Sequence, residues 1–385
     1  MKILHYFPTT LLSEGGTVRV AIDMCAVLAN RGHDVTWLTC DCTDVPESWK
    51  QDSPNTPTVV HLGAFEKSGK RLTKEQCTIA KETICNMDVV HVHAMWDPSN
   101  PQIAHACDNT NTPWVLSVHG MLDDWSMKQR TLKKRVYLST VGRCMVRTPA
   151  VFHTTAEAEN KQASKWFKHR NTAVVPCIVD LDPYANVPNP AEALEVYGES
   201  DKPTVLFLSR VHEKKSIETL IDATKILKDA ESPIRLFIAG TGEEAYAKTL
   251  KARAQSIGVE EHVSFLGMVV GSLKLSLYAM ADIFALPTQQ ENFGLVYAEA
   301  MLCETAIIGT KGTDIWQELE EGGAIIKERT PEAFAGAIKK LTEDKELLQA
   351  KGAAGRKHVL HWLNTDTVAK GYEAMYKQAV SGQKS

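Results

Sequence analysis

Long apolar runs are absent from this chain of 385 residues. No stretch contains the roughly 20 consecutive apolar residues that a membrane-spanning helix needs. The first residues, MKILHYFPTT, also lack the apolar core and the cleavage site of a secretory signal peptide, and they suit a first β-strand instead. We therefore expect a cytoplasmic protein.

Closely spaced cysteines are also missing. The chain has nine cysteines, an odd number, and Cys40 and Cys42 are the only close pair. Neither a C-x-x-C pair nor a Cys/His spacing typical of zinc ligands occurs. We therefore predict no disulfide framework and no metal site, and we expect most cysteines to be small buried residues.

A strong charge of either sign is missing as well. The formal net charge is −4, which argues against a general nucleic-acid-binding surface. The P-loop and the nucleophilic serine elbow are absent too, which argues against two large enzyme classes. No cofactor is predicted.

The chain does contain a repeated alternation of short apolar strands and amphipathic helices. The fold class expected from it is α/β, with Rossmann-like doubly wound domains. Because 385 residues exceed what one core normally organises, we expect two domains, at 1–180 and 203–360, joined by a Pro/Asp/Asn-rich linker at 181–202. Strands are expected at 2–7, 34–39, 88–93, 114–118, 150–155, 204–209, 234–239, 263–266, 282–286 and 305–309.

Residues 281–310 are the most informative stretch, with the sequence ADIFALPTQQENFGLVYAEAMLCETAIIGT. The stretch predicts a strand, a polar loop, a helix from Leu295 and a second strand. Ligands of doubly wound sheets bind where such strands end, so the loop is the first candidate for a site.

The residues of this loop suit a ligand that carries both phosphate and hydroxyl groups. Gly294 lets the backbone approach a ligand, and free N–H groups of Phe293, Gly294 and Leu295 at a helix start would bind an anion. Glu291 and Glu299, on either side, can accept hydrogen bonds from hydroxyls. A nucleotide sugar fits this combination. The alternative is that both glutamates are ordinary surface residues.

A second candidate site follows the strand at 204–209. Arg210 and Lys215 lie just after it, and two such cations can grip a diphosphate from two sides. Lys214 competes with its neighbour for that role. A solvated basic turn is the alternative.

Histidines accompany two further strands. His119 ends a strand and precedes a glycine, which places it at the sheet edge where ligands bind. His91 and His93 lie within a strand, where packing explains them.

The glutamate pair, in its setting, resembles the E-x7-E signature of retaining glycosyltransferase family 4. That setting is a strand ending in Leu-Pro, then Glu-Asn-Phe-Gly-Leu, then Glu-Ala-Met. The resemblance covers about residues 2–380 and includes GGTVRVAIDMCAVLANRGHDVTWLT near the start and HTTAEAE at 153–159. It implies a GT-B fold, in which two Rossmann-like domains face each other across a cleft and a C-terminal helix at 361–385 crosses back to the first domain.

The resemblance also implies an activity: transfer of a sugar from a nucleotide-diphosphate-sugar donor to an acceptor hydroxyl, with retained anomeric configuration, in polysaccharide or glycolipid biosynthesis. No nucleophilic carboxylate is assignable, so front-face attack is expected, with fixed cations in place of a metal ion. The implied catalytic residues are His119, Glu291, Arg210 and Lys215. The implied donor-binding residues are Gly15, Gly16, Arg210, Lys215, Gly240, Gly267, Asn292, Phe293, Gly294, Leu295 and Glu299. For Gly15 and Gly16, a helix-entry turn is the alternative.

The chain departs from the family pattern at three turns, which we expect to leave the fold unchanged. Cys177 and Ile178 replace the usual Asn and Gly at the crossover between domains. Ser216 replaces the Gly that usually follows the lysine, and Glu304 replaces the Gly of a Cys-Gly-x-Pro turn.

Two other function classes stay open at this point. An NAD-dependent oxidoreductase also uses doubled Rossmann units, but the glycine fingerprint that begins at Gly240 is incomplete, since Ala245 occupies the third glycine position. An inactive sugar-nucleotide-binding partner protein would keep the fold and lose charged site residues. Glu291, Arg210 and Lys215 are all present.

A basic stretch at 127–147 contrasts with the slightly acidic chain. Seven basic residues and no acidic one lie between Lys128 and Arg147, with apolar residues among them. A helix over this stretch would resemble an interfacial helix on an anionic membrane, and several family members act on lipid-linked acceptors. One hypothesis is therefore peripheral contact with the inner face of a membrane and a sugar, glycolipid or lipid-linked acceptor. The other is a solvated helix packed on the sheet.

Overall fold

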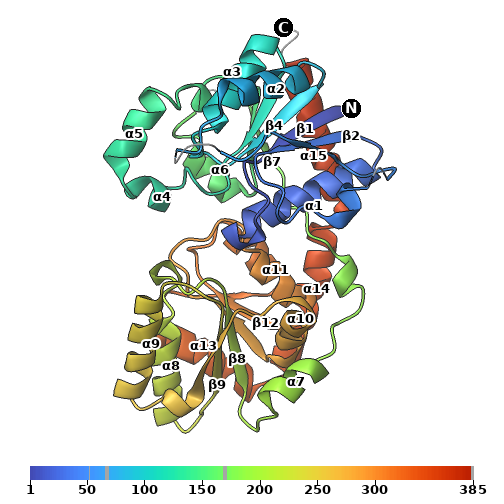
Figure 1. Ribbon diagram of the computed structural model, residues 1–385. Helices are drawn as coiled ribbons and strands as arrows, with labels where there is room; N and C mark the ends of the chain where they lie inside the picture. Colours follow the sequence, from blue (N-terminus) through green and yellow to red (C-terminus); the bar gives the residue numbers. More distant parts are fainter. Residues whose placement is uncertain (52, 66–68, 168–170, 383–385) are drawn as a thin grey trace. The chain divides into compact units, whose positions relative to one another are not determined.

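The computed structural model of the chain describes residues 1–51, 53–65, 69–167 and 171–382. It divides into two compact units (Figure 1). The N-terminal unit comprises Met1–Asp180 together with Thr365–Ser385, and the C-terminal unit comprises Leu181–Asn364. In the described part of the chain, no helix is both long and apolar enough to span a membrane. All nine cysteines are unpaired, as expected from their spacing.

The N-terminal unit is built on a sheet of seven parallel strands. They are β1 (Lys2–Tyr6), β2 (Asp34–Thr39), β3 (Thr58–His61), β4 (Val89–His93), β5 (Trp114–Ser117), β6 (Val151–Thr154) and β7 (Thr172–Val174). Their order is β3-β2-β1-β4-β5-β6-β7, which reverses direction between β1 and β4. Such a reversal is the switch point at which doubly wound sheets bind ligands.

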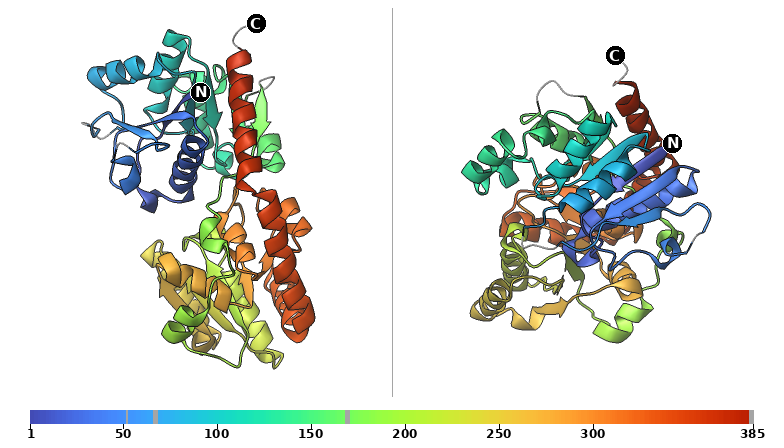
Figure 2. Two further views of the ribbon diagram at one scale, coloured as in Figure 1. Left: turned by 90° about the vertical axis from the view of Figure 1, so that its right-hand side faces the viewer. Right: turned by 45° about the horizontal axis from the view of Figure 1, so that its top comes forward.

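The two faces of this sheet differ in chemistry, because side chains alternate along each strand. On one face, Leu4, Val92 and Phe152 form a core with α2 (Lys74–Ile84) and α3 (Asn100–Thr110). The other face carries the histidines of β1, β4 and β6. Helices α1 (Gly16–Asn30) and α15 (Thr365–Ser381) cover that face, and α15 runs along the sheet (Figure 2).

The basic stretch does not form one helix, contrary to the prediction. It is divided into α4 (Asp124–Lys128), α5 (Thr131–Ser139) and the 3-10 turn η3 (Cys144–Val146). The first break comes at Gln129, which is extended, and Arg130, whose φ is 53°. The Lys134 ammonium donates to the Ser126 carbonyl at 2.6 Å, which holds the two short helices together across the break.

The C-terminal unit is built on six parallel strands. They are β8 (Thr204–Leu208), β9 (Arg235–Ala239), β10 (Val263–Gly267), β11 (Ile283–Ala285), β12 (Ala306–Gly309) and β13 (Ile325–Ile326). Their order is β10-β9-β8-β11-β12-β13, so the switch point lies between β8 and β11. Each predicted strand of both units agrees with an observed strand to within one residue at either end. Strands β3, β7 and β13 were not predicted.

Helices flank this second sheet as well (Figure 1). Helix α8 (Glu218–Asp229) packs against α9 (Glu244–Ser256) and α13 (Pro331–Glu343). Helix α11 (Leu295–Leu302) packs against α10 (Gly271–Met280) and α14 (Lys345–Trp362), and α12 spans Trp316–Glu321. Two doubly wound α/β units are therefore present, which confirms the expected fold class.

Residues 181–202 are more than the linker expected from their composition. They contain the 3-10 turn η4 (Asp182–Tyr184) and helix α7 (Ala191–Tyr197). The N–H of buried Ala193 donates to Ser276 Oγ of α10 at 2.9 Å. This segment is thus a packed part of the C-terminal unit.

Candidate active site

Two loops meet at the switch point of the C-terminal unit, where β8 and β11 pair. The loop after β8 carries Arg210, Lys214 and Lys215, and the loop after β11 carries Glu291. The Lys214 carbonyl accepts a hydrogen bond from the N–H of Gln289 at 2.8 Å, which joins the two loops. The sheet therefore brings together two groups of predicted site residues that lie far apart in the sequence.

The ammonium of Lys215 and the carboxylate of Glu291 form an ion pair. Lys215 is only 4% exposed, and this burial, with the nearby charges of Lys214 and Arg210, lowers its pKa to about 7. The Glu291 carboxylate opposes that shift, because a contacting opposite charge favours the charged amine. Arg210 is exposed. A strongly perturbed amine at a ligand-binding sheet edge is typical of functional sites.

The turn after β8 directs Lys215, rather than its neighbour, into the protein. The 3-10 turn η5 (Glu213–Lys215) starts at His212, whose Nδ1 accepts from the N–H of Lys214 at 3.0 Å. Ser216 then adopts a φ of 51°, a left-handed conformation that glycine adopts more readily. The side chain of Lys214 stays partly exposed.

The loop after β11 leads into the amino terminus of α11. Gly294 has a φ of 64°, and a Cβ there would lie 2.9 Å from both Glu291 Cγ and the Tyr297 ring. Among the described residues, the N–H groups of Phe293, Gly294 and Leu295 have no hydrogen-bond partner. They form a helix start that can bind an anion next to Glu291.

The strand end that follows holds Glu291 in place. Its N–H donates to the Gly312 carbonyl at 2.7 Å, and its own carbonyl accepts from Asp314 at 3.0 Å. Thr310 Oγ1 donates to the Thr288 carbonyl at 2.7 Å. The loops after β8, β11 and β12 thus support one another, and the carboxylate is carried by a rigid frame.

Two predicted donor-binding residues have partners within the protein. Phe293 is 3% exposed, and its ring stacks on Trp362 with centroids 5.4 Å apart. Its side chain therefore belongs to the core, and only its backbone can meet a ligand. Asn292 also has interactions within the protein.

Glu299 is bound by two residues that the sequence analysis missed. Lys274 Nζ donates to its Oε1 at 2.7 Å, and Tyr278 Oη donates to its Oε2 at 3.0 Å. Both donors come from α10, and no local pattern in the sequence connects them with Glu299. A carboxylate offers about four lone-pair sites, so it retains capacity for a diol.

The predicted donor-side glycines contact each other. The N–H of Gly240 donates to the Gly267 carbonyl at 2.6 Å. A Cβ on Gly240, whose φ is 131°, would lie 1.9 Å from the Ser209 carbonyl oxygen. The close approach of two backbones therefore requires this glycine whether or not a ligand is bound.

In the N-terminal unit, the predicted residues lie near the ends of neighbouring strands. Gly15, with a φ of 119°, precedes α1, and Gly16 is the first residue of that helix. His119 follows β5 with a φ of 48°, and Ala94 follows the adjacent β4 with a φ of 67°. Strained residues at the ends of two neighbouring strands are typical of ligand sites.

A buried acid that the sequence analysis missed fixes the residue after His119. Glu159, on α6 (Glu157–Ala163), is 0% exposed and accepts hydrogen bonds from the N–H groups of Gly120 at 2.5 Å and Thr155 at 2.6 Å. Burial raises the pKa of this carboxyl group. The HTTAEAE motif therefore serves to connect the ends of β5 and β6.

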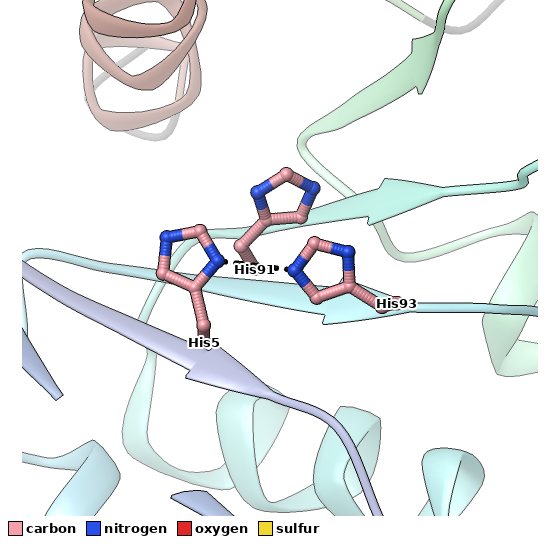
Figure 3. A group of neighbouring side chains, drawn as sticks. All are labelled: His5, His91 and His93. Carbon is pink, nitrogen blue, oxygen red and sulfur yellow. Dashed lines mark hydrogen bonds between the residues drawn. The ribbon is translucent and has the colours of Figure 1, made fainter. Parts of the chain in front are cut away.

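One group of potential metal ligands comes together in the described ranges, although no metal site was predicted. It consists of His5, His91 and His93, whose nearest ring nitrogens lie within 4.8 Å of one another (Figure 3). All three are fully buried.

Sequence comparisons match both units to glycosyltransferases. The model of "Glycosyltransferase Family 4" matches residues 14–183, and that of "Glycosyl transferases group 1" matches residues 192–358. A GDP-mannose-dependent alpha-(1-6)-phosphatidylinositol monomannoside mannosyltransferase of Mycobacterium tuberculosis is 29% identical over 66% of this chain and 67% of its own. A D-inositol 3-phosphate glycosyltransferase of Geodermatophilus obscurus is 26% identical over 94% of this chain and 85% of its own.

Solved structures agree on the fold. Sucrose-phosphate synthase from Thermosynechococcus elongatus superposes with a TM-score of 0.79 at 18% identity, covering 99% of both chains. HepE from Anabaena, solved in complex with UDP, gives 0.78 at 18% identity, covering 98% of this chain and all of its own. The two family matches run from residue 14 to residue 358 with one short gap, and this chain belongs to the family 4 glycosyltransferases of the GT-B fold.

Proposed function

We propose that this protein is a retaining, metal-independent glycosyltransferase that binds the donor diphosphate at the β8–β11 switch point. The observation that carries the proposal is the ion pair between buried Lys215 and partly exposed Glu291, beside the start of α11. A cation and free N–H groups suit a diphosphate, and a carboxylate suits the hydroxyls of a sugar.

The chemical step needs no nucleophile from the protein. The bond between the anomeric carbon and the leaving phosphate oxygen breaks while the acceptor oxygen bonds to the same face of that carbon, and the acceptor's proton passes to the leaving phosphate. Arg210, Lys215 and the helix start stabilise the charge that grows on the diphosphate. Removing one such group costs about 3–4 kcal/mol at the barrier.

The ion pair gives Lys215 and Glu291 a shared role in donor binding. A diphosphate that reaches Lys215 competes with Glu291 for the ammonium. Once the phosphate has taken its place, the carboxylate is released and accepts hydrogen bonds from the sugar hydroxyls. Glu299, held by Lys274 and Tyr278, is the corresponding acceptor for the ribose diol.

A donor panel tests the proposal directly. GDP-mannose and UDP-glucose come first, because named relatives use the former and HepE was solved with the latter. We expect transfer or slow hydrolysis with one nucleotide sugar, an unchanged rate in EDTA, and an NMR spectrum of the product that shows the donor's anomeric configuration. Lys215→Met should slow the reaction by about 10²–10³-fold. The matched control is Lys225→Met, at a surface lysine. Inversion, or loss in EDTA with rescue by a divalent ion, would refute the mechanism.

We further propose that the acceptor side contacts an anionic membrane through the exposed part of the basic stretch. Leu132 is 77% exposed, Val136 53% and Val141 55%, and they lie among basic side chains. A hollow is lined by Arg135, Arg147, Lys165 and Trp166, among others. Lys165 is paired with Asp124, so two arginines are available to a headgroup. The exposed apolar side chains and the basic hollow support a lipid-linked acceptor, although the stretch does not form one helix.

Vesicle binding tests the membrane contact. The protein should co-sediment with vesicles of anionic lipid and not with neutral ones, and salt should release it. Lys133→Glu with Arg135→Glu should abolish binding and leave nucleotide binding intact. The matched control is Lys74→Glu with Lys81→Glu on α2. Equal binding to neutral vesicles would instead favour a soluble acceptor.

A further inference from the structure

A continuous chain of hydrogen bonds crosses the histidine-bearing face of the N-terminal sheet. Its outer part starts at His119, whose Nε2 lies 3.2 Å from His93 Nδ1. His93 Nε2 lies 3.0 Å from His5 Nδ1 (Figure 3), and His5 Nε2 lies 3.4 Å from Tyr376 Oη on α15.

The inner part of the chain continues from the same tyrosine. Tyr376 Oη lies 2.8 Å from His91 Nδ1, and His91 Nε2 lies 2.6 Å from Ser117 Oγ. Ser117 Oγ lies 2.6 Å from His153 Nδ1. The last link joins His153 Nε2 to the carbonyl oxygen of Val175 at 2.9 Å.

Strand register places these side chains together. His5 lies opposite His91 in the β1–β4 pair, and Ser117 lies opposite both His93 and His153 in its two pairs. Residues opposite each other on parallel strands point to the same face, so the five residues form a row on one face. Tyr376 connects the two parts of this row.

All the histidines of this row are neutral at physiological pH. Burial lowers the pKa of His5 to about 3 and that of His153 to about 4, and it lowers the pKa values of His91 and His93 well below the usual 6.5. The pKa of His119 falls to about 3 for the same reason. A neutral imidazole has one N–H donor and one lone-pair acceptor, so each ring must donate on one side and accept on the other.

The inner end sets the direction of every bond. A carbonyl only accepts, so His153 donates from Nε2 to Val175 and accepts at Nδ1 from the hydroxyl of Ser117. The serine oxygen accepts from His91 Nε2, which leaves His91 Nδ1 to accept from the hydroxyl of Tyr376. Each residue has one proton to donate, so the same direction continues outward.

The hydrogen bonds of the outer part run in the same direction, from His119 towards Tyr376. The tyrosine oxygen accepts from His5 Nε2, His5 Nδ1 accepts from His93 Nε2, and His93 Nδ1 accepts from His119 Nε2. His119 is then the Nε2–H tautomer, with a lone pair on Nδ1. His119 is partly exposed, and in the described structure its Nδ1 has no hydrogen-bond partner.

We propose that the chain of hydrogen bonds locks the tautomer of His119, so that Nδ1 is a fixed acceptor for a hydroxyl of the substrate. The nature of that hydroxyl, on a sugar, rests on the proposed function, whereas the lock itself does not. Tyr376 and Ser117 are positioning residues in this scheme, because they act on the substrate only through His119.

Two other roles for the histidine row fit the geometry less well. The row cannot conduct protons, because the carbonyl of Val175 at its inner end has no proton to pass on. A metal ion bound by His5, His91 and His93 through their nearest nitrogens would need lone pairs on both His5 Nδ1 and His93 Nε2. That requirement would break the hydrogen bond between them.

NMR of the full-length, ligand-free protein measures the tautomer without any assay of activity. Long-range correlation spectra of 15N-histidine-labelled protein distinguish protonated from unprotonated ring nitrogens. We expect His5, His91, His93, His119 and His153 each to be a single Nε2–H tautomer that does not change between pH 8 and pH 6. His105, exposed on α3 and outside the chain of hydrogen bonds, is the internal control. A mixture of tautomers, an Nδ1–H form at His119, or a bound metal would overturn the proposal.

Removing one hydroxyl from the chain of hydrogen bonds tests whether that chain sets the tautomer of His119. Ser117→Ala removes the hydroxyl that connects His91 to His153, and it should let His119 exchange between both tautomers. The value of kcat/KM should fall between about twofold and tenfold, as expected for one hydrogen bond. Ser117→Thr should restore the single tautomer and the rate, and His105→Gln should change neither.

An unchanged His119 tautomer in folded Ser117→Ala would refute the lock. If this variant fails to fold, the wild-type tautomer still decides the question. If the wild type shows the single tautomer but transfers no sugar, the proposed function fails while the lock stands.

Discussion

The two units bury polar groups in opposite ways. The N-terminal unit places neutral imidazoles from β1, β4 and β6 on one sheet face and connects them through hydrogen bonds. The C-terminal unit keeps its strands apolar and places the ion pairs Lys215–Glu291 and Lys274–Glu299 at the switch-point side of its sheet. A satisfied neutral network orients groups and stabilises the fold, whereas a buried charge costs desolvation and is available to a ligand. In the function proposed above, the N-terminal unit orients the substrate and the C-terminal unit stabilises the charge on the diphosphate.

Acidification should have the largest effect, because it should lower the stability of the N-terminal unit more than that of the C-terminal unit. Below pH 6.5 the unfolded chain binds protons that the buried histidines exclude, so the stability of the N-terminal unit should fall as the pH falls towards 4. Each histidine that stays neutral contributes about 1.4 kcal/mol per pH unit. Hydrogen-exchange mass spectrometry, corrected for intrinsic rates, should show loss of protection in the N-terminal unit before the C-terminal unit.

Glu159 has the opposite effect on the pH dependence of the stability of the N-terminal unit. Burial raises its pKa above the usual 4.5, so its contribution is present at low pH and lost as the pH rises. One carboxyl group cannot offset five histidines. Simultaneous loss of protection in both units would mean that the histidine row does not determine the acid response.

Replacing one buried polar group in each unit should have opposite effects. Lys215→Met should lower turnover by about 10²–10³-fold. It should leave the melting temperature nearly unchanged, because the desolvation cost of the ammonium and its ion pair with the partly exposed Glu291 are lost together. His91→Leu should lower stability by about 1–3 kcal/mol, because Ser117 and Tyr376 lose a partner. Kinetics and thermal unfolding measure both. If Lys214→Met is the damaging change instead, the diphosphate ligand has been assigned to the wrong lysine.

Substitutions of the two site glutamates, Glu291 and Glu299, should have different effects on turnover and on nucleotide affinity. Glu291→Gln should lower turnover and leave affinity for the free nucleoside diphosphate unchanged or higher, since the competitor for Lys215 is weakened. Glu299→Ala should weaken that affinity by about 10- to 100-fold, as expected for hydrogen bonds to a charged group. Calorimetry decides, with exposed Glu332→Ala as the control. Loss of binding in the Glu291 variant alone would reverse the two roles.

The smallest effect concerns a strained turn with no role in binding. Glu304 follows α11 with a φ of 60°, in the left-handed region that favours glycine. Glu304→Gly should raise stability by about 1 kcal/mol, because a left-handed residue with a Cβ costs about that much. Glu304→Ala keeps the Cβ and should bring no such gain in denaturant unfolding. A larger gain from the alanine variant would point to the charge of Glu304 as the cause.

Local features of the fold were readable in the sequence. Buried parallel strands appear as short apolar runs, so Asp34–Thr39 was predicted residue for residue. The start of α11 at Leu295 was readable because a glycine precedes it. The break at Arg130 was not, because no Gly or Pro marks it and a tertiary contact of Lys134 supports it.

Contacts between strands were not readable, because they depend on sheet order and register. Lys215 and Glu291 are 76 residues apart, and they meet only because β11 lies beside β8. The histidine row likewise requires that β4 lie between β1 and β5. In the sequence, His91 and His93 looked like packing residues, and only the register shows that the rings are connected.

Helix α15 has a consequence for the order of biosynthesis. It covers a sheet whose strands were translated first, so residues 181–364 must be made before Tyr372 and Tyr376 leave the ribosome. At ordinary rates that delay is roughly 10 to 40 s. An apolar sheet face left open for so long would attract other nascent chains. The imidazoles of this face can instead form hydrogen bonds to water until α15 is made.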